Sequence, residues 1–204
     1  MPTHNQRLMV MLFSSLTVCC VSAGVFADDL VKPGEYAAPE LERLERFYGL
    51  WSVTVDHFGT DGRHVGTVKG REQVNWILDN HAIERNFRSG EKPNIYRAIG
   101  TVAWNAVEGK YHGVWFDSTS VNGPTIAKGD WDEKEQAFVF VLESVAEGGK
   151  KIRYKVVDSF LDDDSRLSTT FLMDGDRLTK VMETHFKRAM PCPSGPRIID
   201  PIGH

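Results

Sequence analysis

Residues 152–187 read IRYKVVDSFLDDDSRLSTTFLMDGDRLTKVMETHFK. Three β-type runs in this stretch are separated by an acidic turn at residues 162–164 and by a tight Asp-Gly-Asp turn at residues 174–176. Short runs of this composition, bounded by turn residues, are typical of antiparallel strands joined by hairpins. The stretch therefore predicts three consecutive strands with no helix between them.

The same alternation of short runs and turns extends back to residue 50, and it predicts an all-β, antiparallel, up-and-down barrel of about ten strands. Closure would pair the first strand with the last and leave no free edge. A barrel of this size encloses more volume than its side chains fill, so we expect a cavity. One short helix over residues 39–47 precedes the strands. The expected strands are 51–55, 65–78, 81–87, 95–104, 111–117, 125–131, 138–145, 152–160, 167–173 and 178–187.

The first 27 residues have the three parts of a secretory signal peptide. Arg7 supplies the positive start, residues 8–21 are apolar, and small residues lead to Ala27, after which we place the cleavage. An uncleaved membrane anchor and lipid attachment at Cys19 or Cys20 are the alternatives. We expect export to the periplasm or beyond, and a mature chain without a membrane span.

The remaining chain reads as an extended leader over residues 28–39, one barrel domain over residues 40–188, and a Pro- and Gly-rich irregular tail over residues 189–204. Cleavage removes Arg7, one of the 24 Lys and Arg, and leaves 23 against 28 Asp and Glu, a net charge of −5. Without a basic tract, nucleic acid is not an expected partner. Cys192 is then the one cysteine left, so it is either paired between molecules or an incidental surface thiol.

Four stretches of the chain resemble the domain-of-unknown-function family 1579. They are residues 44–51, 66–76, 100–105 and 111–118, and the similarity runs over most of residues 41–187. The resemblance implies a calycin-like barrel, a relative of lipocalins and fatty-acid-binding proteins, that holds a ligand. It implies no catalytic residues.

Gly49, Leu50 and Trp51 are also similar to the Gly-x-Trp sequence that begins the first strand of lipocalins. The resemblance implies a structural role for Trp51, which would close one end of the barrel. A basic side chain from the last strand, Lys187 or Arg188, would cover its ring through a cation–π contact.

The strand over residues 111–117 contains the first candidate binding residues. Alternation places Trp115 and Asp117 on one face, with His112 and Phe116 on the other. If the first face points inward, Trp115 is a ligand platform and Asp117 a hydrogen-bonding or general-base group at the mouth. The alternative is that Trp115 is core and Asp117 caps the following Ser- and Thr-rich turn.

Two charged residues inside expected strands share a face with apolar neighbours: Glu72 lies beside Trp76, and Arg85 beside Phe87. Within the lumen they would form a mutual ion pair or hold a polar ligand head. The alternative is a solvated outer face. Glu84, Arg97, Glu183 and His185 are also charged residues inside expected strands.

The histidines show no spacing typical of a metal site, so we expect no metal and no cofactor. A strand histidine can ligate haem inside a barrel, which makes His112 and His185 the candidates if haem is bound. The chain contains no nucleophile elbow, phosphate-binding glycine loop or paired catalytic carboxylates.

The sequence therefore favours an exported barrel that binds a small apolar or amphipathic molecule. The expected binding residues are Glu72, Trp76, Arg85, Phe87, Trp115 and Asp117. Two alternatives stay open: an isomerase or cyclase that uses the same cavity, and an envelope interaction module with a filled core. Whether the chain is an enzyme is open, although the absence of a motif argues against it.

Overall fold

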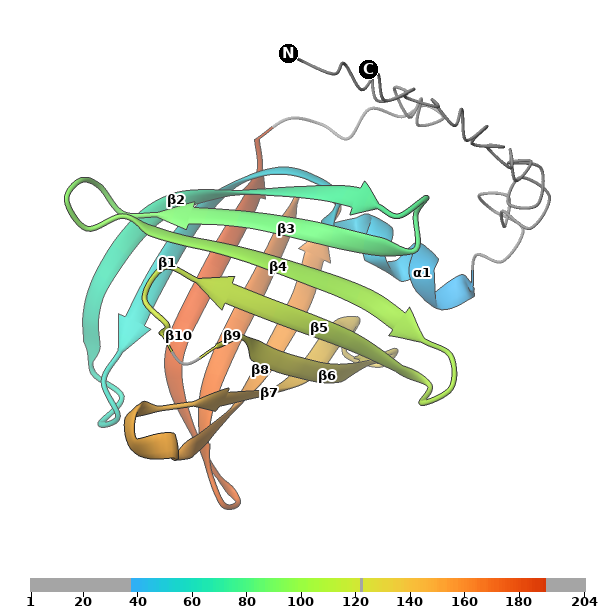
Figure 1. Ribbon diagram of the computed structural model, residues 1–204. Coiled ribbons are helices and arrows are strands. Elements are labelled where there is room, and N and C mark those ends of the chain that lie inside the picture. The colour runs from blue at the N-terminus through green and yellow to red at the C-terminus, as the bar shows by residue number, and fades with distance from the viewer. Residues whose placement is uncertain (1–37, 122, 190–204) are drawn as a thin grey trace, which may run out of the picture. The chain divides into compact units, whose positions relative to one another are not determined.

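A computed structural model describes residues 38–121 and 123–189, except for the side chain of Glu147. Within this part of the chain, ten antiparallel strands form one closed barrel in sequence order, with β1 paired to β10 (Figure 1). The expected all-β, up-and-down, calycin-like barrel with one short helix is thereby confirmed. The strands are β1 Gly49–Phe58, β2 His64–Ile77, β3 Ala82–Ser89, β4 Tyr96–Asn105, β5 Lys110–Asp117, β6 Thr125–Asp132, β7 Ala137–Val145, β8 Lys151–Asp162, β9 Ser165–Asp174 and β10 Arg177–Arg188, with a 3-10 turn η2 at Glu147–Gly149.

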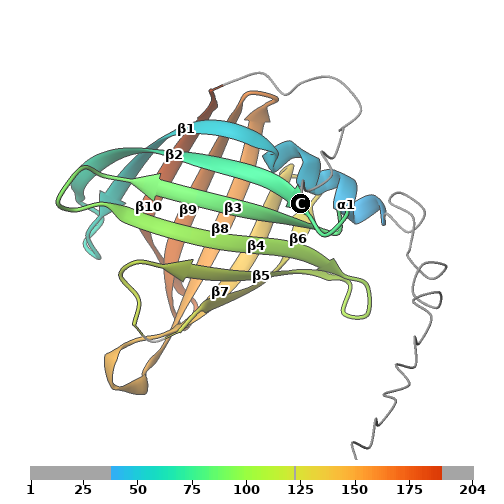
Figure 2. The same ribbon diagram turned by 45° about the horizontal axis from the view of Figure 1, so that its top comes forward.

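The helix lies across one end of the barrel (Figure 2). It consists of α1 (Pro39–Leu44) and a 3-10 turn, η1 (Glu45–Phe47). Pro39 occupies the first turn, where its missing N–H is not needed. Gly49 follows with a φ of +120°, which allows the sharp turn into β1. The helix buries Leu41, Leu44 and Phe47 against the barrel end.

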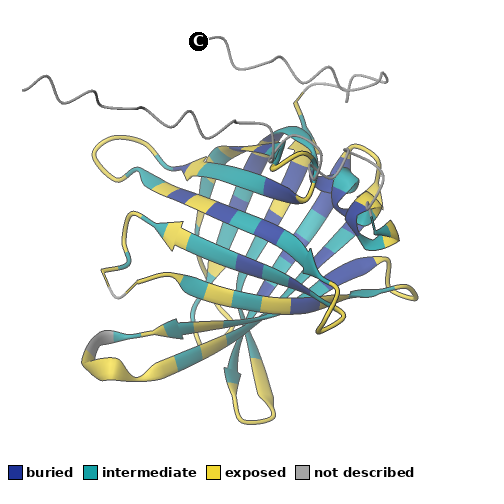
Figure 3. Ribbon diagram, turned by 45° about the vertical axis from the view of Figure 1, so that its right-hand side comes forward, coloured by how far each residue is buried: buried dark blue, intermediate teal, exposed yellow. Residues whose placement is uncertain are grey.

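Burial alternates along the strands, so that every second side chain points inward (Figure 3). At the helix end, the inward side chains form an aromatic cluster. The ring centroid of Phe47 lies 5.1 Å from that of Phe138 and 5.0 Å from that of Phe160. Tyr111 adds a further contact, with its ring centroid 4.9 Å from that of Phe138. This end of the barrel is therefore filled.

Trp51 is buried at the same end, at the start of β1. Its Nε1 donates a 2.8 Å hydrogen bond to the carbonyl of Phe47, which ties the strand to η1. The guanidinium of Arg188 lies over its ring, with Cζ 4.2 Å from the centroid. Arg188 also donates to the carbonyls of Tyr48 and Asp163. Of the two expected candidates, Lys187 and Arg188, it is Arg188 that covers the ring of Trp51.

Several expectations fall on residues outside the described ranges. They are the signal peptide over residues 1–27, all but the last two residues of the leader, and the tail from residue 190, which includes Cys192. Cleavage after Ala27 and the lipid-anchored alternative therefore stay predictions. In the described part of the chain, no helix is both long enough and apolar enough to span a membrane.

Candidate functional site

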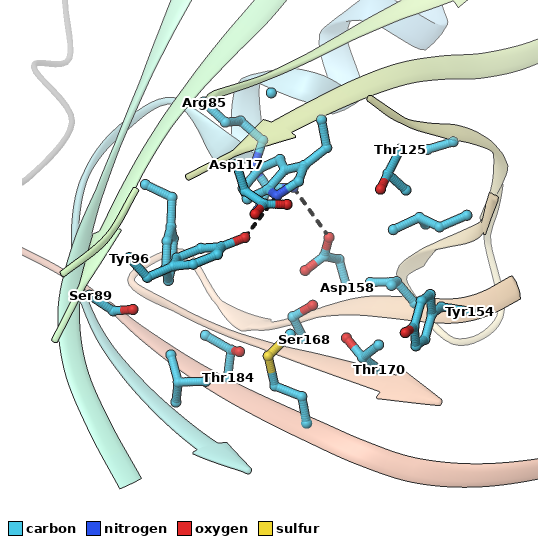
Figure 4. A pocket seen from close by; sticks show the side chains of 18 of the residues that line it. Arg85, Ser89, Tyr96, Asp117, Thr125, Tyr154, Asp158, Ser168, Thr170 and Thr184 are labelled. Atoms are coloured by element: carbon cyan, nitrogen blue, oxygen red, sulfur yellow. Dashed lines mark hydrogen bonds and ion pairs between the residues drawn. The ribbon is translucent and has the colours of Figure 1, made fainter. Parts of the chain in front are cut away.

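The barrel encloses a cavity of about 670 Å³ (Figure 4). Its lining includes His57 near the end of β1, Asn94 in the turn between β3 and β4, and Thr125 at the start of β6. These positions lie at the strand ends away from the helix, so the cavity reaches the end of the barrel that the aromatic cluster does not fill. The cavity expected from the number of strands is present.

One side of the cavity is aromatic and is built by β3, β4 and β5. Phe87, Tyr96 and Trp115 lie side by side there, with the Phe87 centroid 6.0 Å from that of Tyr96 and 6.3 Å from that of Trp115. Nε1 of Trp115 donates a 3.1 Å hydrogen bond to the hydroxyl of Tyr96. Burial raises the pKa of the Tyr96 phenol; the bond from Trp115 opposes this effect and the charge of Asp117 adds to it. This aromatic wall is apolar, and the phenol of Tyr96 is neutral at physiological pH.

The opposite side of the cavity is built by β8, β9 and β10, and it carries buried polar side chains among apolar ones such as Val156 and Met182. Asp158 stands directly opposite Ser168 in the β8–β9 pairing, and Ser168 directly opposite Thr184 in the β9–β10 pairing. All three are buried and line the cavity (Figure 4). Among the described residues, the Ser168 and Thr184 hydroxyls have no hydrogen-bond partner. We call this set the polar row.

The floor of the cavity is a group of four charged side chains: Glu72, Arg85, Asp158 and Arg166. Nε of Arg85 lies 2.8 Å from Oε1 of Glu72, and its Nη1 lies 3.7 Å from Oδ2 of Asp158. Nη1 of Arg166 lies 3.3 Å from Oδ1 of Asp158, and its Nη2 contacts Oε2 of Glu72. Two cations thus meet two anions in a buried, electroneutral group, which we call the charged floor. Charges removed from water need this degree of pairing.

Aromatic rings border the two guanidinium groups of the charged floor. Cζ of Arg166 lies 3.4 Å from the ring centroid of Phe186, and Cζ of Arg85 lies 5.7 Å from that of Trp115. Burial lowers the pKa of Arg166 to about 10, with Arg85 adding to the decrease and Glu72 opposing it. Burial also disfavours the charge on Arg85, but Glu72 and Asp158 outweigh it and raise its pKa above the usual value. Both arginines are therefore charged at neutral pH.

A family model described as protein of unknown function (DUF1579) matches residues 37–188. The chain belongs to this family. The resemblance inferred from the four sequence stretches is confirmed.

A search of curated proteins found no significant match to this DUF1579 chain. Among solved structures, an S-type phycobiliprotein lyase from Guillardia theta matches with 12% sequence identity and a TM-score of 0.49. The match covers 73% of the DUF1579 chain and 92% of the lyase chain.

Four of the six expected binding residues line the cavity of the DUF1579 barrel: Arg85, Phe87, Trp115 and Asp117. Glu72 points inward but lies beneath the cavity in the charged floor, where it is fully buried. Glu72 and Arg85 form an ion pair that points inward, as one of the two interpretations predicted. The other interpretation, which placed them on a solvated outer face, is wrong.

Trp76 is not part of the cavity lining. It lies toward the helix end, packs against the aromatic core, and its Nε1 donates a 3.0 Å hydrogen bond to Oε2 of Glu45 in η1. Alternation predicts its inward direction, but alternation does not say which end of the barrel the helix fills. Its expected place in the binding site is therefore corrected to a place in the closed end.

Asp117 occupies the expected position at the mouth of the cavity and also caps the turn that follows β5. It lies at the rim of the cavity, at the end of β5. Its Oδ1 accepts hydrogen bonds from the backbone N–H of Thr119 at 2.8 Å and of Ser120 at 2.9 Å, and one from the Thr119 hydroxyl. The carboxylate thus caps the turn, as the alternative interpretation of this residue predicted.

The two histidines considered for haem are not in the cavity lining of the DUF1579 barrel. His112 alternates with inward Tyr111, and its Nε2 lies 3.1 Å from the Glu108 carboxylate. His185 is half exposed and pairs with Glu183 at 3.2 Å. Both point away from the lumen, so the suggestion that either ligates haem inside the barrel is wrong. The described residues include no group of three or more His, Cys, Asp or Glu that could hold a metal ion.

Sequence reasoning missed Asp158, Arg166 and the hydroxyls of the polar row. Asp158 alternates with Val156 and Phe160, which is the same signal that identified Glu72. Arg166 lies between the acidic turn at residues 162–164 and the expected start of the next strand at Leu167, whereas β9 begins at Ser165. Alternation in the sequence could therefore have identified Asp158 as an inward residue, but it could not have identified Arg166.

Proposed function

We propose that the barrel binds one small, largely apolar molecule in its cavity. The observation that carries this proposal is a hollow of about 670 Å³ with an aromatic wall on one side and a polar row on the other. Volumes of this order, apolar walls and a few convergent polar groups are the usual features of small-molecule sites. The alternative of a filled interaction module does not fit a barrel with this cavity.

The expected affinity follows from the area that such a ligand buries. At about 25 cal/mol per Å², burial of about 400 Å² of apolar ligand surface contributes about 10 kcal/mol of binding free energy. The ligand loses translational and rotational freedom when it binds, which offsets part of this contribution. The expected dissociation constant is therefore in the micromolar range. The two carboxylates on the cavity wall, Asp117 and Asp158, already accept hydrogen bonds or pair with guanidinium groups. This engagement favours binding over an isomerase or cyclase in which one of these two carboxylates moves the proton.

The experiment is a titration of the purified barrel with N-phenyl-1-naphthylamine, an uncharged dye that fluoresces in apolar surroundings. We expect saturable, blue-shifted emission with a micromolar dissociation constant. The variant Ala127→Trp adds a ring inside the cavity, whereas Lys128→Trp adds the same ring to the exposed neighbouring position on β6. Dye binding should be lost in the first variant and kept in the second. Absence of saturable binding to the folded wild-type protein would refute the proposal.

We also propose that the protein acts after export, in the periplasm or outside the cell. The support is the sequence of residues 1–27, with Arg7, the apolar run and the small residues before Ala27. Cell fractionation and N-terminal sequencing test it. A mature chain that begins at Asp28 in the exported fraction is the expected result, and an intact Met1 in the cytoplasmic fraction would contradict it.

A further inference from the structure

Among the described residues, the charged floor of the cavity leaves no surplus cation to receive an anionic ligand. The charged floor contains two arginines and two carboxylates in mutual contact, so its net charge is zero. At the rim, Asp117 adds a further negative charge to the lining. A ligand carboxylate at the floor would therefore have to displace a protein carboxylate or be buried without a partner of its own. Either outcome is unfavourable in a site shielded from water.

A cationic head is disfavoured by the same contacts. Both oxygens of Asp158 already face guanidinium groups, Oδ1 that of Arg166 at 3.3 Å and Oδ2 that of Arg85 at 3.7 Å. An ammonium group at the floor would meet these two cations at close range. At the floor it would gain no carboxylate that is free of another partner, because Asp117 lies at the rim, where its Oδ1 caps the turn.

Uncharged polar groups, in contrast, find complementary partners at the same place. The hydroxyls of Ser168 and Thr184 line the cavity and have no partner among the described residues, so each can donate and accept one hydrogen bond. Arg85 uses Nε for Glu72, while its Nη groups lie farther from their neighbour, with Nη1 3.7 Å from Asp158. The guanidinium, which also lines the cavity, retains N–H groups that can donate to a ligand oxygen.

We propose that the cavity selects an uncharged amphiphile, whose hydroxyl, carbonyl or amide head lies between Arg85 and the polar row, over a fatty-acid-type carboxylate or an alkylammonium ion. This inference rests on the proposed binding function and names the class of ligand. The apolar part of the ligand would lie against the aromatic wall of Phe87, Tyr96 and Trp115.

The first test is displacement of bound N-phenyl-1-naphthylamine from the wild-type protein by three molecules with the same chain, decan-1-ol, decanoate and decylammonium, at pH 7.5. We expect decan-1-ol to displace the dye at a concentration about tenfold lower than either charged molecule. Equal or stronger displacement by decanoate or decylammonium would overturn the inference. Failure of the dye itself to bind would instead refute the binding function.

The second test separates a hydroxyl contact from simple partition into an apolar space. Thr184→Val keeps the shape of the side chain and removes its hydroxyl, and Thr169→Val makes the same change on the outward face of β9. The first variant should weaken the binding of decan-1-ol about fivefold to tenfold relative to that of the dye, and the second should change neither. Unchanged decan-1-ol affinity in Thr184→Val combined with Ser168→Ala would overturn the role of the polar row.

The third test changes the charge of the floor. Asp158→Asn leaves one cation without its anion, so decanoate should bind about tenfold more tightly than to wild type, and the preference for decan-1-ol should disappear. Asp130→Asn removes the same charge from the outer face of β6 and should leave the order of affinities as in wild type. A folded Asp158→Asn protein that still rejects decanoate would contradict the electrostatic argument. If this variant does not fold, the wild-type series and Thr184→Val decide.

Discussion

The ring of Trp115 lies across Gly100, the residue directly opposite it on β4. A Cβ at position 100 would lie 2.3 Å from Cε3 of the ring, a separation that real Cβ atoms do not reach. The missing side chain therefore leaves room for the indole at this point of the cavity wall, where Nε1 donates a hydrogen bond to the Tyr96 hydroxyl. A glycine inside a strand often marks such a close approach.

Replacement of Gly100 by Ala should force the Trp115 ring out of this position. We expect a loss of about 1–3 kcal/mol in the free energy of unfolding, because the ring and its neighbours must shift, together with weaker dye binding. Denaturant unfolding and tryptophan fluorescence measure both effects. Gly66→Ala is the matched control, because a Cβ at that position of β2 meets nothing within 4 Å, so its stability should stay within about 1 kcal/mol of wild type.

Removal of one arginine from the charged floor should destabilise the barrel strongly. Arg166→Met leaves Glu72 and Asp158 with Arg85 as their one remaining cationic partner in the charged floor, and we expect a loss of about 3–5 kcal/mol in the free energy of unfolding. Arg153→Met breaks an exposed pair with Glu143 and should change the stability by less than about 0.5 kcal/mol. Similar melting temperatures for the two variants would show that the buried group contributes little.

Two substitutions at Asp117 separate its role in the turn from a role in binding. Asp117→Ala removes the acceptor for Thr119 and Ser120 and should lower the free energy of unfolding by about 1 kcal/mol. Asp117→Asn keeps an acceptor oxygen and should restore most of that loss. If the residue acts only in the turn, both variants bind the dye as wild type does; a loss of binding in folded Asp117→Asn would instead assign the carboxylate to the ligand site.

Tyr96 should make the stability depend on pH in the alkaline range. Burial raises the pKa of its phenol above the ordinary value of 10.0. Below pH 10 the phenol keeps its proton in both states, and the stability is complete. As the pH rises above 10, the unfolded chain ionises first, so stability falls until the pH passes the folded pKa.

Absorbance at 295 nm follows this ionisation directly. Burial also raises the pKa of Tyr111, so wild type should show one more late-titrating phenol than Tyr96→Phe does. The variant should also lose less stability than wild type above pH 10. A Tyr96 that titrates with the exposed phenols would mean that the aromatic wall is wetter than the structure indicates.

The architecture and several inward residues could be predicted from the sequence because both depend on local signals. Turn residues mark the ten strands, and period-two alternation brings Glu72 and Arg85 to the lumen. The similarity to the lipocalin Gly-x-Trp led to Trp51, and closure of the barrel then brings Arg188 of the last strand over its ring. A choice between Lys187 and Arg188 required the register of β10 against β1.

The rest of the site depends on relationships between strands that the sequence does not state. The polar row exists because Asp158, Ser168 and Thr184 are aligned by the registers of two hairpins, including the irregularity between Phe160 and Asp162. Alternation predicts Trp76 in the site because it gives the direction of a side chain but not its depth along the barrel. The position of the closed end is set by the packing of Phe47 and its helix.

The most direct measurement is a crystal structure of the protein with decan-1-ol. The account predicts ligand density inside the barrel, with the chain against Trp115 and the hydroxyl within hydrogen-bond distance of Arg85, Ser168 or Thr184. Side chains that fill the barrel, or density for the ligand only on the outer surface, would contradict it.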